Sequence, residues 1–529
     1  MAHPSDHASA QAGQAAAATD SPCGQAPHGA ALLTALRATL GEAAVRCPTT
    51  DDPLLAHVQD WRQRYLGQAL AVVFPANTDQ VAATVRLCAA HGVSLVPQGG
   101  NTSLVGGSVP DASGKQVVLS LQRLRRVLDI DPVNLSMTVE GGCLLAEVQA
   151  AAAAEGLLFP LSLASEGSCT IGGVLATNAG GTQVLRYGMA RELCLGLEVV
   201  TAQGEVWRNL KGLRKDNSGY DLRDLVIGSE GTLGIVTAAS LKLFPRPASR
   251  LAALVLCPNV DAAVTLLQVA RARLDAELTG FEAMAAHPVT LTQRHLPALA
   301  AVADGLTRNW PGQPDRPDCP DCPNSSAYSG DGIADGPWLV LLDAASPERE
   351  PMLRASLEAV LADALGAGHI ANALVSHSDA QYRAMWALRE AIPMAEKIEG
   401  QMVKHDVGVP SSRIPEFLRQ TVAALQTAFP GSRVVCFGHL GDGNLHFNVQ
   451  APQGTSDQAF LAEHEHAVNA IVYGHVRALG GTVSAEHGIG QLKRAELAAQ
   501  QGPVATQWMR AIKTALDPLG TLNPQRLVP

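Results

Sequence analysis

The segment Gly438–Asn448 carries residue types that can do chemistry, in the order Gly-His-Leu-Gly-Asp-Gly-Asn-Leu-His-Phe-Asn. Its Gly441–Asn444 portion predicts a turn. The residues that follow predict a strand on which His446 and Asn448 share one face, because side chains along a strand alternate. His439 approaches from the other side of the turn, so both imidazoles can meet at one point. Such a pair indicates either a metal site or two histidines that only hydrogen-bond the backbone of a turn.

A second reactive segment, Ser484–Gly490, places Glu486 and His487 together in a loop flanked by glycine. With His439 and His446, Glu486 completes a set of two imidazoles and one carboxylate, which leaves coordination positions open as a catalytic metal requires. An ion held there could bind the hydroxyl and the carboxylate of a hydroxy acid together and lower the pKa of the hydroxyl. His487 is left over as a general base whose ordinary pKa suits neutral pH.

Three glycine-rich segments lie upstream, at 97–108, 160–181 and 221–236. Glycine lets backbone N–H groups line a concave loop without a Cβ in the way, which suits a pyrophosphate. The chain has neither a G-x-x-x-x-G-K-[ST] motif nor a strand-linked G-x-G-x-x-G motif, so a phosphate-loop nucleotide hydrolase and a Rossmann NAD site are both disfavoured. The segments predict a dinucleotide bound in another fold, and tight turns alone are the alternative.

In their order and wording these three segments resemble the FAD-binding domain of the vanillyl-alcohol oxidase/p-cresol methylhydroxylase superfamily, over about residues 60 to 245. The resemblance implies that the first loop wraps the pyrophosphate and that the other two line the adenosine and the isoalloxazine. Some members attach the flavin covalently through a histidine in the first loop. That loop here has no His or Cys, so we expect non-covalent FAD. The cofactor contacts expected on this basis are Pro97, Gly99, Gly100, Asn101, Thr102, Ser103, Gly106, Gly107, Ser108, Pro160, Ser165, Gly172, Gly173, Asn178, Gly181, Glu230, Gly231, Ile235 and, from the C-terminal tail, Asn523.

The two reactive segments resemble the substrate domain of D-2-hydroxyglutarate and D-lactate dehydrogenases of this superfamily, and of the glycolate oxidase flavin subunit. The resemblance implies that His439, His446 and Glu486 bind a divalent metal, usually zinc. It implies that His487 is the general base and that Asn448 contacts the substrate.

Two cations upstream match segments of the same family. Arg389 lies in Trp386–Glu390 and Lys404 in Lys404–Asp406, and the resemblance implies that each binds a substrate carboxylate, since a buried carboxylate must be paired. A solvated charge is the alternative for each. One departure stands out: Pro393 occupies the position, four residues after Arg389, where the hydroxyglutarate enzymes commonly carry Thr, so a hydroxyl that could contact one carboxylate is absent.

Together these residues predict a dehydrogenase that transfers a hydride from the α-carbon of a D-2-hydroxy acid to flavin N5. D-2-hydroxyglutarate or D-malate is the expected substrate, and D-lactate or glycolate is the alternative. A flavin subunit of a larger oxidase, or a flavin-binding subunit without turnover, is a further alternative. For the electrons, the resemblance suggests electron-transfer flavoprotein, a quinone or a cytochrome as acceptor, and a homodimer is common among such enzymes.

The elements that must position these residues alternate between short apolar strands and helices, which predicts an α+β fold. We expect a disordered tail at 1–30, an FAD-binding domain at 31–247 and a substrate domain with an antiparallel sheet at 248–480. Pro245-Arg246-Pro247 marks the break between the domains, and 305–337 reads as a flexible insert within the second. Residues 481–529 are expected to complete the active site and pack back towards the flavin.

The bulk composition agrees with a globular enzyme. With 529 residues, the chain exceeds the roughly 250–300 residues at which single cores stop growing. Forty-nine acidic against 39 basic residues, a formal charge of −10, argue against a nucleic-acid surface. Ten scattered cysteines and the lack of a signal pattern favour a cytoplasmic setting. Cys319 and Cys322 have the spacing of a metal pair but no second pair nearby, so an ordinary loop is favoured there.

Overall fold

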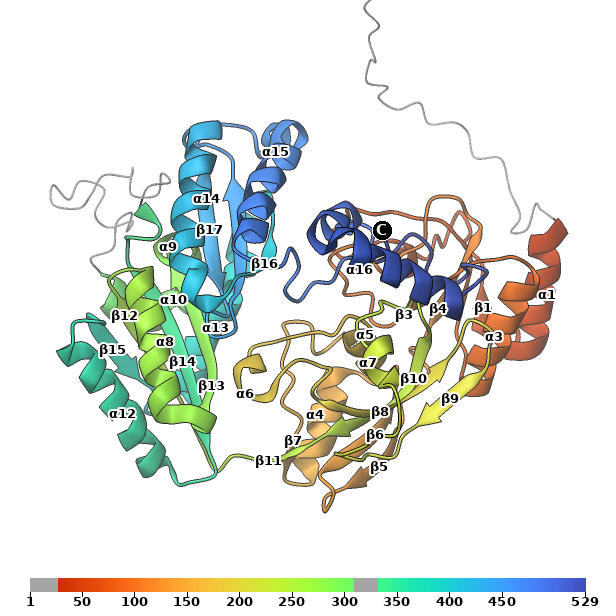
Figure 1. The fold of residues 1–529 in the computed structure, drawn as a ribbon, viewed down its shortest axis with the longest axis horizontal. Helices are drawn as coiled ribbons and strands as arrows, with labels where there is room; N and C mark the ends of the chain where they lie inside the picture. Colours follow the sequence, from red (N-terminus) through yellow and green to blue (C-terminus); the bar gives the residue numbers. More distant parts are fainter. Residues whose placement is uncertain (1–26, 309–331) are drawn as a thin grey trace, which may run out of the picture.

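The computed structural model describes residues 27–308 and 332–529, and Figure 1 shows two lobes joined by the chain that follows β11. The N-terminal lobe contains a four-stranded sheet in the order β1-β2-β4-β3, in which β2, β4 and β3 run parallel. Apolar side chains of α1 and α3 pack on this sheet. The elements are α1 (Pro27–Leu40), η1 (Glu42–Ala44), β1 (Val45–Arg46), α2 (Leu55–Val58), β2 (Ala69–Val73), α3 (Thr78–Ala90), β3 (Leu95–Gln98) and β4 (Gln116–Ser120).

A second sheet of the same lobe is antiparallel, in the order β5-β6-β10-β8-β9. Apolar runs predict strands at 71–74, 93–96, 116–119, 136–139, 195–201 and 234–243, and the structure confirms them to within two residues. Strands β5 and β9 were not anticipated because they are short and largely exposed. The remaining elements are β5 (Val127–Asp131), β6 (Ser136–Glu140), α4 (Leu145–Ala154), β7 (Leu157–Leu158), α5 (Ile171–Ala176), α6 (Val184–Tyr187), β8 (Cys194–Val200), β9 (Val206–Asn209), α7 (Leu222–Val226), β10 (Ile235–Lys242) and β11 (Phe244–Pro245).

The second lobe is built on a seven-stranded antiparallel sheet in the order β15-β12-β14-β13-β17-β18-β16. This confirms the α+β class and the antiparallel sheet expected from the sequence. The strands are β12 (Ser249–Cys257), β13 (Leu278–Ala285), β14 (Trp338–Ser346), β15 (Asn372–Val375), β16 (Asp406–Gly408), β17 (Arg433–Gly438) and β18 (Asn444–Gln450).

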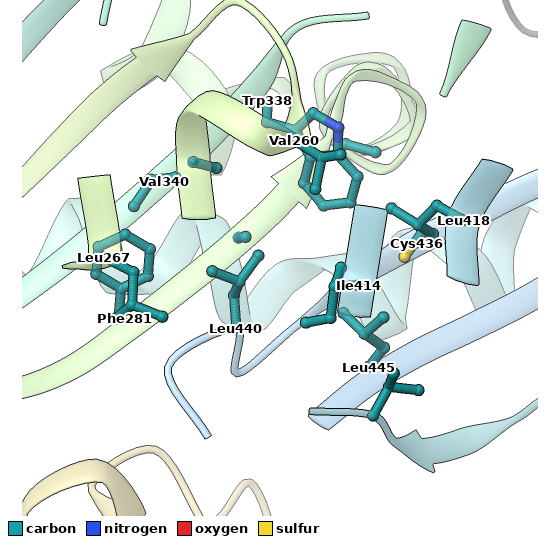
Figure 2. Close-up of a cluster of buried hydrophobic side chains, with 14 of the residues drawn as sticks. Val260, Leu267, Phe281, Trp338, Val340, Ile414, Leu418, Cys436, Leu440 and Leu445 are labelled. Carbon is teal, nitrogen blue, oxygen red and sulfur yellow. The ribbon is translucent and has the colours of Figure 1, made fainter. Parts of the chain in front are cut away.

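Helices cover both faces of this sheet. Side chains of α8, α12, α14 and α15 form one core with it, which Figure 2 shows around Phe281 and Trp338, and α9 and α13 form a second core on the other face. The helices are α8 (Val260–Leu274), η2 (Asp275–Glu277), α9 (Ala286–His295), α10 (Pro297–Ala300), η3 (Ala301–Ala303), α11 (Asp304–Thr307), α12 (Glu350–Gly366), α13 (Asp379–Glu399), η6 (Ser411–Arg413), α14 (Ile414–Ala428) and α15 (Asp457–Ala478).

The alternation of side chains along the strands decides which residues face α13. Phe281 on β13 and Leu445 and Phe447 on β18 enter the first core. Glu282, His446 and Asn448, one residue away along their strands, therefore point to the face that α13 covers. The polar residues of the site are brought together on this face.

The C-terminal segment returns to the first lobe. Helix α16 (Arg494–Leu516), kinked at Gly502, lies over that lobe in Figure 1. The tail then runs beside β3, where the Leu95 amide donates to Thr521 O and the Asn523 amide donates to Leu95 O, both at 2.8 Å. The expectation that the C-terminal segment packs back towards the predicted flavin loops is confirmed.

Three expectations need adjustment or lie outside the described residues. Helix α1 begins at Pro27, so the last four residues of the expected tail, 27–30, are helical, because Leu32, Leu33 and Leu36 give the helix an apolar face to bury. Helix α11 occupies Asp304–Thr307, so the insert is shorter than 305–337 at its start. Cys319 and Cys322 lie outside the described residues. Among the residues described, no helix is both long enough and apolar enough to cross a bilayer.

Candidate active site

Three segments meet on the α13 face of the large sheet. His439 follows the end of β17, and His446 lies on β18. Glu486 and His487 come from the loop that follows α15, which reaches the sheet where Gly408 pairs with Thr482. The turn between His439 and His446 requires glycine at Gly443, whose φ is +86° and whose added Cβ would lie 2.3 Å from the Val409 oxygen. The sequence predicted this turn and its convergence.

The Glu486 carboxylate lies between three imidazoles. Its oxygens are 3.8 Å from His439 Nε2, 3.6 Å from His446 Nε2 and 3.6 Å from His487 Nε2. A tetrahedral ion with bonds of about 2.1 Å holds its ligand atoms roughly 3.4 Å apart. Each imidazole nitrogen is therefore near that spacing from a Glu486 oxygen, His439 from Oε2 and the other two from Oε1, and all four side chains are largely buried.

Within the described part of the chain, the group whose ligand atoms all lie within 4.8 Å of one another is Asp406, His446, Glu486 and His487, so it contains Asp406 and not His439. The Asp406 carboxylate is already occupied, however. It accepts the backbone N–H groups of Glu486 and His487 at 3.0 and 2.9 Å and the Asn444 side-chain amide at 2.8 Å. Asp406 thus holds the loop in place, and the set that includes His439 leaves it in that role. Sequence reasoning used Lys404–Asp406 only for its lysine and missed this carboxylate.

Arg389 and His439 share one buried carboxylate. Glu282 on β13 is fully buried; its Oε1 lies 2.5 Å from His439 Nδ1 and its Oε2 accepts from Arg389 Nε at 2.7 Å. The Arg389 guanidinium also stacks on the Phe437 ring, 4.9 Å from its centroid. Sequence reasoning missed Glu282. An acidic residue inside an eight-residue buried strand is the signal that could have revealed it.

Lys404 and Asn448 also share a carboxylate. Glu396, on the same helix α13 as Arg389, accepts from Lys404 Nζ at 2.8 Å and from Asn448 Nδ2 at 2.6 Å. Glu396 is 1% exposed, and the Lys404 side chain is 33% exposed. Both predicted substrate-binding cations therefore lie at the site, each with a buried acidic partner that the sequence analysis did not include.

Burial and neighbouring charges set the protonation of the metal-free site. Burial lowers the pKa of His487 to about 4 and lowers that of His446 well below its usual value. Burial raises the pKa of Glu486 to about 7. Burial would also lower the pKa of His439, but the Glu282 carboxylate raises it to about 9. At neutral pH the imidazoles of His446 and His487 are therefore neutral, and each has a lone pair for a cation or a proton.

The three glycine-rich segments meet in the first lobe, and several of their glycines leave no room for a larger residue. An added Cβ on Gly100 would lie 1.8 Å from the Ser168 oxygen, and one on Gly181 would lie 2.1 Å from the Ser162 oxygen. The first and second segments thus pack backbone against backbone. An added Cβ on Gly180 would lie 3.9 Å from Glu486 Cβ, so the second segment also borders the imidazole cluster.

Side chains of the predicted cofactor residues hold these loops in shape. Asn101, with φ of +53°, donates to Ala56 O and Gln59 O and accepts from Ser108 Oγ. Ser103 Oγ accepts from the amides of Val105 and Gly107 at 3.4 and 3.3 Å. The side chains hold the loop while leaving backbone groups to line it, which fits a pyrophosphate.

The second segment is held in shape by a helix N-cap and by hydrogen bonds to backbone amides. Gly172 and Gly173 form the first turn of α5, whose N-cap Thr170 accepts from the Gly173 amide. Asn178 has φ of +48° and accepts from the Arg191 amide. Pro160 is buried, and Ser165 O accepts from the amides of Ser168 and Cys169.

The third segment joins the two halves of the site. Both oxygens of Glu230 accept from backbone amides of the loop that carries Glu486 and His487. Oε1 accepts from Ile489 and Oε2 from Gly490, each at 2.7 Å. Asn523 donates to Glu230 O and Gly107 O, while its own Oδ1 is buried without a partner among the described residues. That orphaned acceptor beside the glycine loops fits a bound cofactor that donates to it.

The Glu230 carboxylate positions the loop, Gly231 packs on Pro97, and Ile235 is in the apolar core. The structure gives no separate contact for Thr102 and shows Gly106, at φ of +68°, beside Tyr65.

Comparison with known proteins finds two family profiles along the chain. Residues 69–209 match a family profile described as FAD binding domain, and residues 246–527 match one described as FAD linked oxidases, C-terminal domain. A protein of Xanthomonas citri pv. viticola named D-2-hydroxyglutarate dehydrogenase is 36% identical over 484 residues, covering 92% of this chain and 94% of that protein. The mitochondrial D-2-hydroxyglutarate dehydrogenase of Bos taurus is 35% identical over 472 residues, covering 89% and 79%.

Solved structures share the fold at lower identity. The structure of p-cresol methylhydroxylase with substrate bound matches with a TM-score of 0.69 at 17% identity, covering 96% of this chain and 98% of that one. A flavin-binding lobe of this fold beside a buried imidazole–carboxylate cluster defines an FAD-dependent oxidoreductase. The chain belongs to the family of FAD-linked oxidases, as its C-terminal match and its relatives above 30% identity show.

Proposed function

We propose that this enzyme oxidises a D-2-hydroxy acid to the 2-oxo acid with non-covalently bound FAD and a divalent metal, zinc in the first instance. The observation that carries the proposal is the convergence of His439, His446 and Glu486 on one point, with His487 beside them. The names of the relatives in Xanthomonas and Bos support the substrate class. When bound, FAD would supply at N5 an acceptor for one hydride, which carries both electrons of the oxidation, and the divalent ion would supply a Lewis acid for the substrate oxygens.

The residues of the chain bind and deprotonate the substrate. His439, His446 and Glu486 hold the ion with positions left open. Arg389 pairs with the carboxylate next to the reacting carbon, and the neutral His487 accepts the proton of the α-hydroxyl as the C–H bond breaks. Asn448 lies between Glu396 and the His405 amide, to which its Oδ1 is bonded at 3.1 Å, so it presents a fixed polar surface to the substrate.

For the particular substrate we propose D-2-hydroxyglutarate or D-malate, because Arg389 and Lys404 supply a cation for each carboxylate. One observation favours a smaller substrate as a second candidate. Glu396 already pairs with Lys404, so the end of the site at Lys404 is less cationic than the sequence suggested. Pro393 offers no hydroxyl, so this end also has one hydrogen-bond donor fewer. D-lactate or glycolate is therefore the second candidate.

The reduced flavin must pass two electrons onward. We propose electron-transfer flavoprotein, a quinone or a cytochrome as acceptor, on the resemblance alone. A homodimer and a cytoplasmic location stay predictions.

Metal removal tests the proposal. The FAD-loaded enzyme is dialysed against EDTA and assayed by dye reduction on D-2-hydroxyglutarate, D-malate, D-lactate and glycolate. We expect turnover to fall at least a hundredfold, as a rough estimate from the loss of Lewis-acid catalysis, with the flavin absorption unchanged, and to return when Zn²⁺, Mn²⁺ or Co²⁺ is added. Full activity in enzyme shown to be metal-free would contradict the metal. Activity on none of the four acids would contradict the substrate class.

A further inference from the structure

One buried carboxylate connects the two halves of the substrate-binding machinery. Glu282 is 0% exposed on β13, and it is 157 residues from His439 and 107 residues from Arg389 along the chain. Its Oε1 lies 2.5 Å from His439 Nδ1, and its Oε2 accepts from Arg389 Nε at 2.7 Å. Each oxygen therefore serves one partner: the imidazole on one side and the guanidinium on the other.

The contact with His439 fixes which imidazole nitrogen is free. An ionised carboxylate can only accept hydrogen bonds, so the proton must be on Nδ1. The nitrogen left to bind a metal, in exchange for its own proton, is then Nε2, the atom that lies 3.8 Å from Glu486. A histidine that binds a metal through one nitrogen needs this kind of partner on the other. Without it, rotation about the ring or a proton on Nε2 would remove one ligand from the set.

The contact with Arg389 fixes the orientation of the guanidinium that is proposed to bind the substrate carboxylate. Arg389 Nε is used by Glu282, and the guanidinium plane rests on the Phe437 ring. The two Nη groups are therefore held in one orientation, the one that can approach a carboxylate in a bidentate way. The side chain is 8% exposed, so an Arg389 that lost Glu282 would be a buried charge without its partner.

We propose that Glu282 is a positioning residue that sets the metal ligand His439 and the carboxylate-binding Arg389 at the same time. This inference rests on the proposed function, and it adds a residue that the motifs of the sequence do not contain. Glu282 does not touch the substrate. It makes the geometry of the ion and the geometry of the substrate carboxylate depend on each other.

Glutamine cannot replace Glu282 in this role, although it has nearly the same shape. Its amide has one accepting oxygen and one donating NH₂. With the oxygen towards His439, the NH₂ faces the Nε–H of Arg389, donor against donor. With the NH₂ towards His439, Nδ1 must accept, so the proton moves to Nε2 and blocks the metal. One of the two partners is always lost.

The test uses the FAD-loaded enzyme with three substitutions. Glu282→Gln removes the charge, and Glu282→Asp keeps the charge but shortens the reach, which covers the case that the Gln variant does not fold. Asp343→Asn is the matched control, because Asp343 is also a 0% exposed carboxylate in the same sheet, on β14, and bonds Thr279 rather than the site. Zn²⁺ affinity is measured by competition with a chromophoric chelator, together with the KM for the best acid of the panel, the inhibition constant of 2-oxoglutarate and the melting temperature.

For Glu282→Gln we expect Zn²⁺ to bind 10- to 100-fold more weakly, as an order of magnitude, and the KM and the inhibition constant to rise roughly tenfold. Glu282→Asp should lose affinity for at least one of the two ligands. Asp343→Asn should leave all three constants within about twofold, whatever it does to the melting temperature. Unchanged Zn²⁺ affinity in both Glu282 variants would overturn the inference.

The failure of the proposed function would look different. In that case the unmodified enzyme itself would not bind Zn²⁺ stoichiometrically, or would be fully active without it. A Glu282 variant that lowers the melting temperature as Asp343→Asn does, with both affinities intact, would show a structural role only.

Discussion

At the scale of single residues, the chemistry depends on imidazoles kept neutral by burial. His487 is the side chain with the most direct task, because among the three described imidazoles beside the Glu486 carboxylate it is the one left to accept a proton once His439 and His446 bind a metal. Its amide is held by Asp406 and its ring lies between Asp406 and Glu486, at 3.6 Å from each. The base is therefore oriented before the substrate arrives.

His487→Asn should lower kcat by a factor of 10² to 10⁴, roughly the contribution of a positioned general base. The asparagine keeps the backbone bond to Asp406 and leaves the proposed metal ligands in place. Stopped-flow reduction of the flavin by substrate is the measurement, with FAD and metal content as controls. Flavin reduction at the original rate in a variant that retains both would remove His487 from its assigned role.

The distal end of the substrate site makes a second residue-scale prediction. Glu396→Gln removes the negative charge that pairs with Lys404, so the ammonium becomes available to a distal carboxylate. We expect the KM for D-2-hydroxyglutarate to fall about fivefold, for roughly 1 kcal/mol of added attraction, and the KM for D-lactate to change little. Glu399→Gln is the control, because Glu399 is on the same helix but pairs with His295 and Arg433. Equal effects on both acids would mean that Lys404 does not contact the substrate.

At the scale of elements, the flavin loops depend on backbone packing that only glycine permits. Gly100→Ala places a Cβ 1.8 Å from the Ser168 oxygen, so the first and second loops must separate. We expect the variant to lose most of its FAD during gel filtration and its melting temperature to fall. Gly167→Ala is the matched control in the same pair of loops, because an added Cβ there meets nothing within 4 Å. If both variants retain FAD, the loops are not packed as described.

Sequence patterns located the elements that follow a clear period. The patterns predict strands at 195–201 and 433–437 and helices at 78–91 and about 457–479, and β8, β17, α3 and α15 lie within two residues of these bounds. A buried strand reads as an apolar run, and Asn77 marks the start of α3 as its N-cap. The strand β13 was missed, because Glu282 interrupts its apolar run. The carboxylate that obscures the strand pattern is the one that contacts His439 and Arg389 in the site.

The site itself was predictable only where its residues are close together in sequence. His439, His446, Glu486 and His487 lie in two short motifs, and the structure places the three imidazoles around the Glu486 carboxylate. Glu282 and Glu396 carry no motif, and Asp406 lies in the Lys404–Asp406 segment without its contacts being predicted, because the sheet and α13 bring these carboxylates to the imidazoles from distant parts of the chain. A pattern in one sequence cannot report contacts that only the tertiary fold creates.

At the scale of the whole molecule, buried histidines make stability depend on acid. Burial lowers the pKa of His287 to about 4, although its bond to Gln450 opposes the shift, while an unfolded histidine titrates near 6.5. Between pH 6.5 and 4 the unfolded state therefore binds a proton that the folded state does not bind. The contribution of His287 to the unfolding free energy is fully present above pH 6.5 and is lost as the pH falls towards 4. The shift of about 2.5 pH units corresponds to about 3 kcal/mol.

Urea unfolding between pH 7 and pH 4.5 measures this effect. In His287→Leu the unfolding free energy should fall less steeply as the pH is lowered than in the unmodified enzyme. The difference in slope against pH should correspond to the uptake of at most one proton on unfolding. His377→Leu is the control, because His377 is exposed at the surface. Identical slopes in all three proteins would show that His287 does not carry the acid sensitivity.

The return of the C-terminal segment to the first lobe bears on the order of events on the ribosome. The glycine loops are synthesised within the first half of the chain, yet Glu230 needs the amides of Ile489 and Gly490, and β3 needs Thr521 and Asn523. A nascent chain that has emerged only to α15 would present an unfinished cofactor lobe, with the Glu230 carboxylate lacking its donors. Capture of the flavin is therefore a late step, which follows translation of the tail and does not guide the folding of the lobe that will hold it.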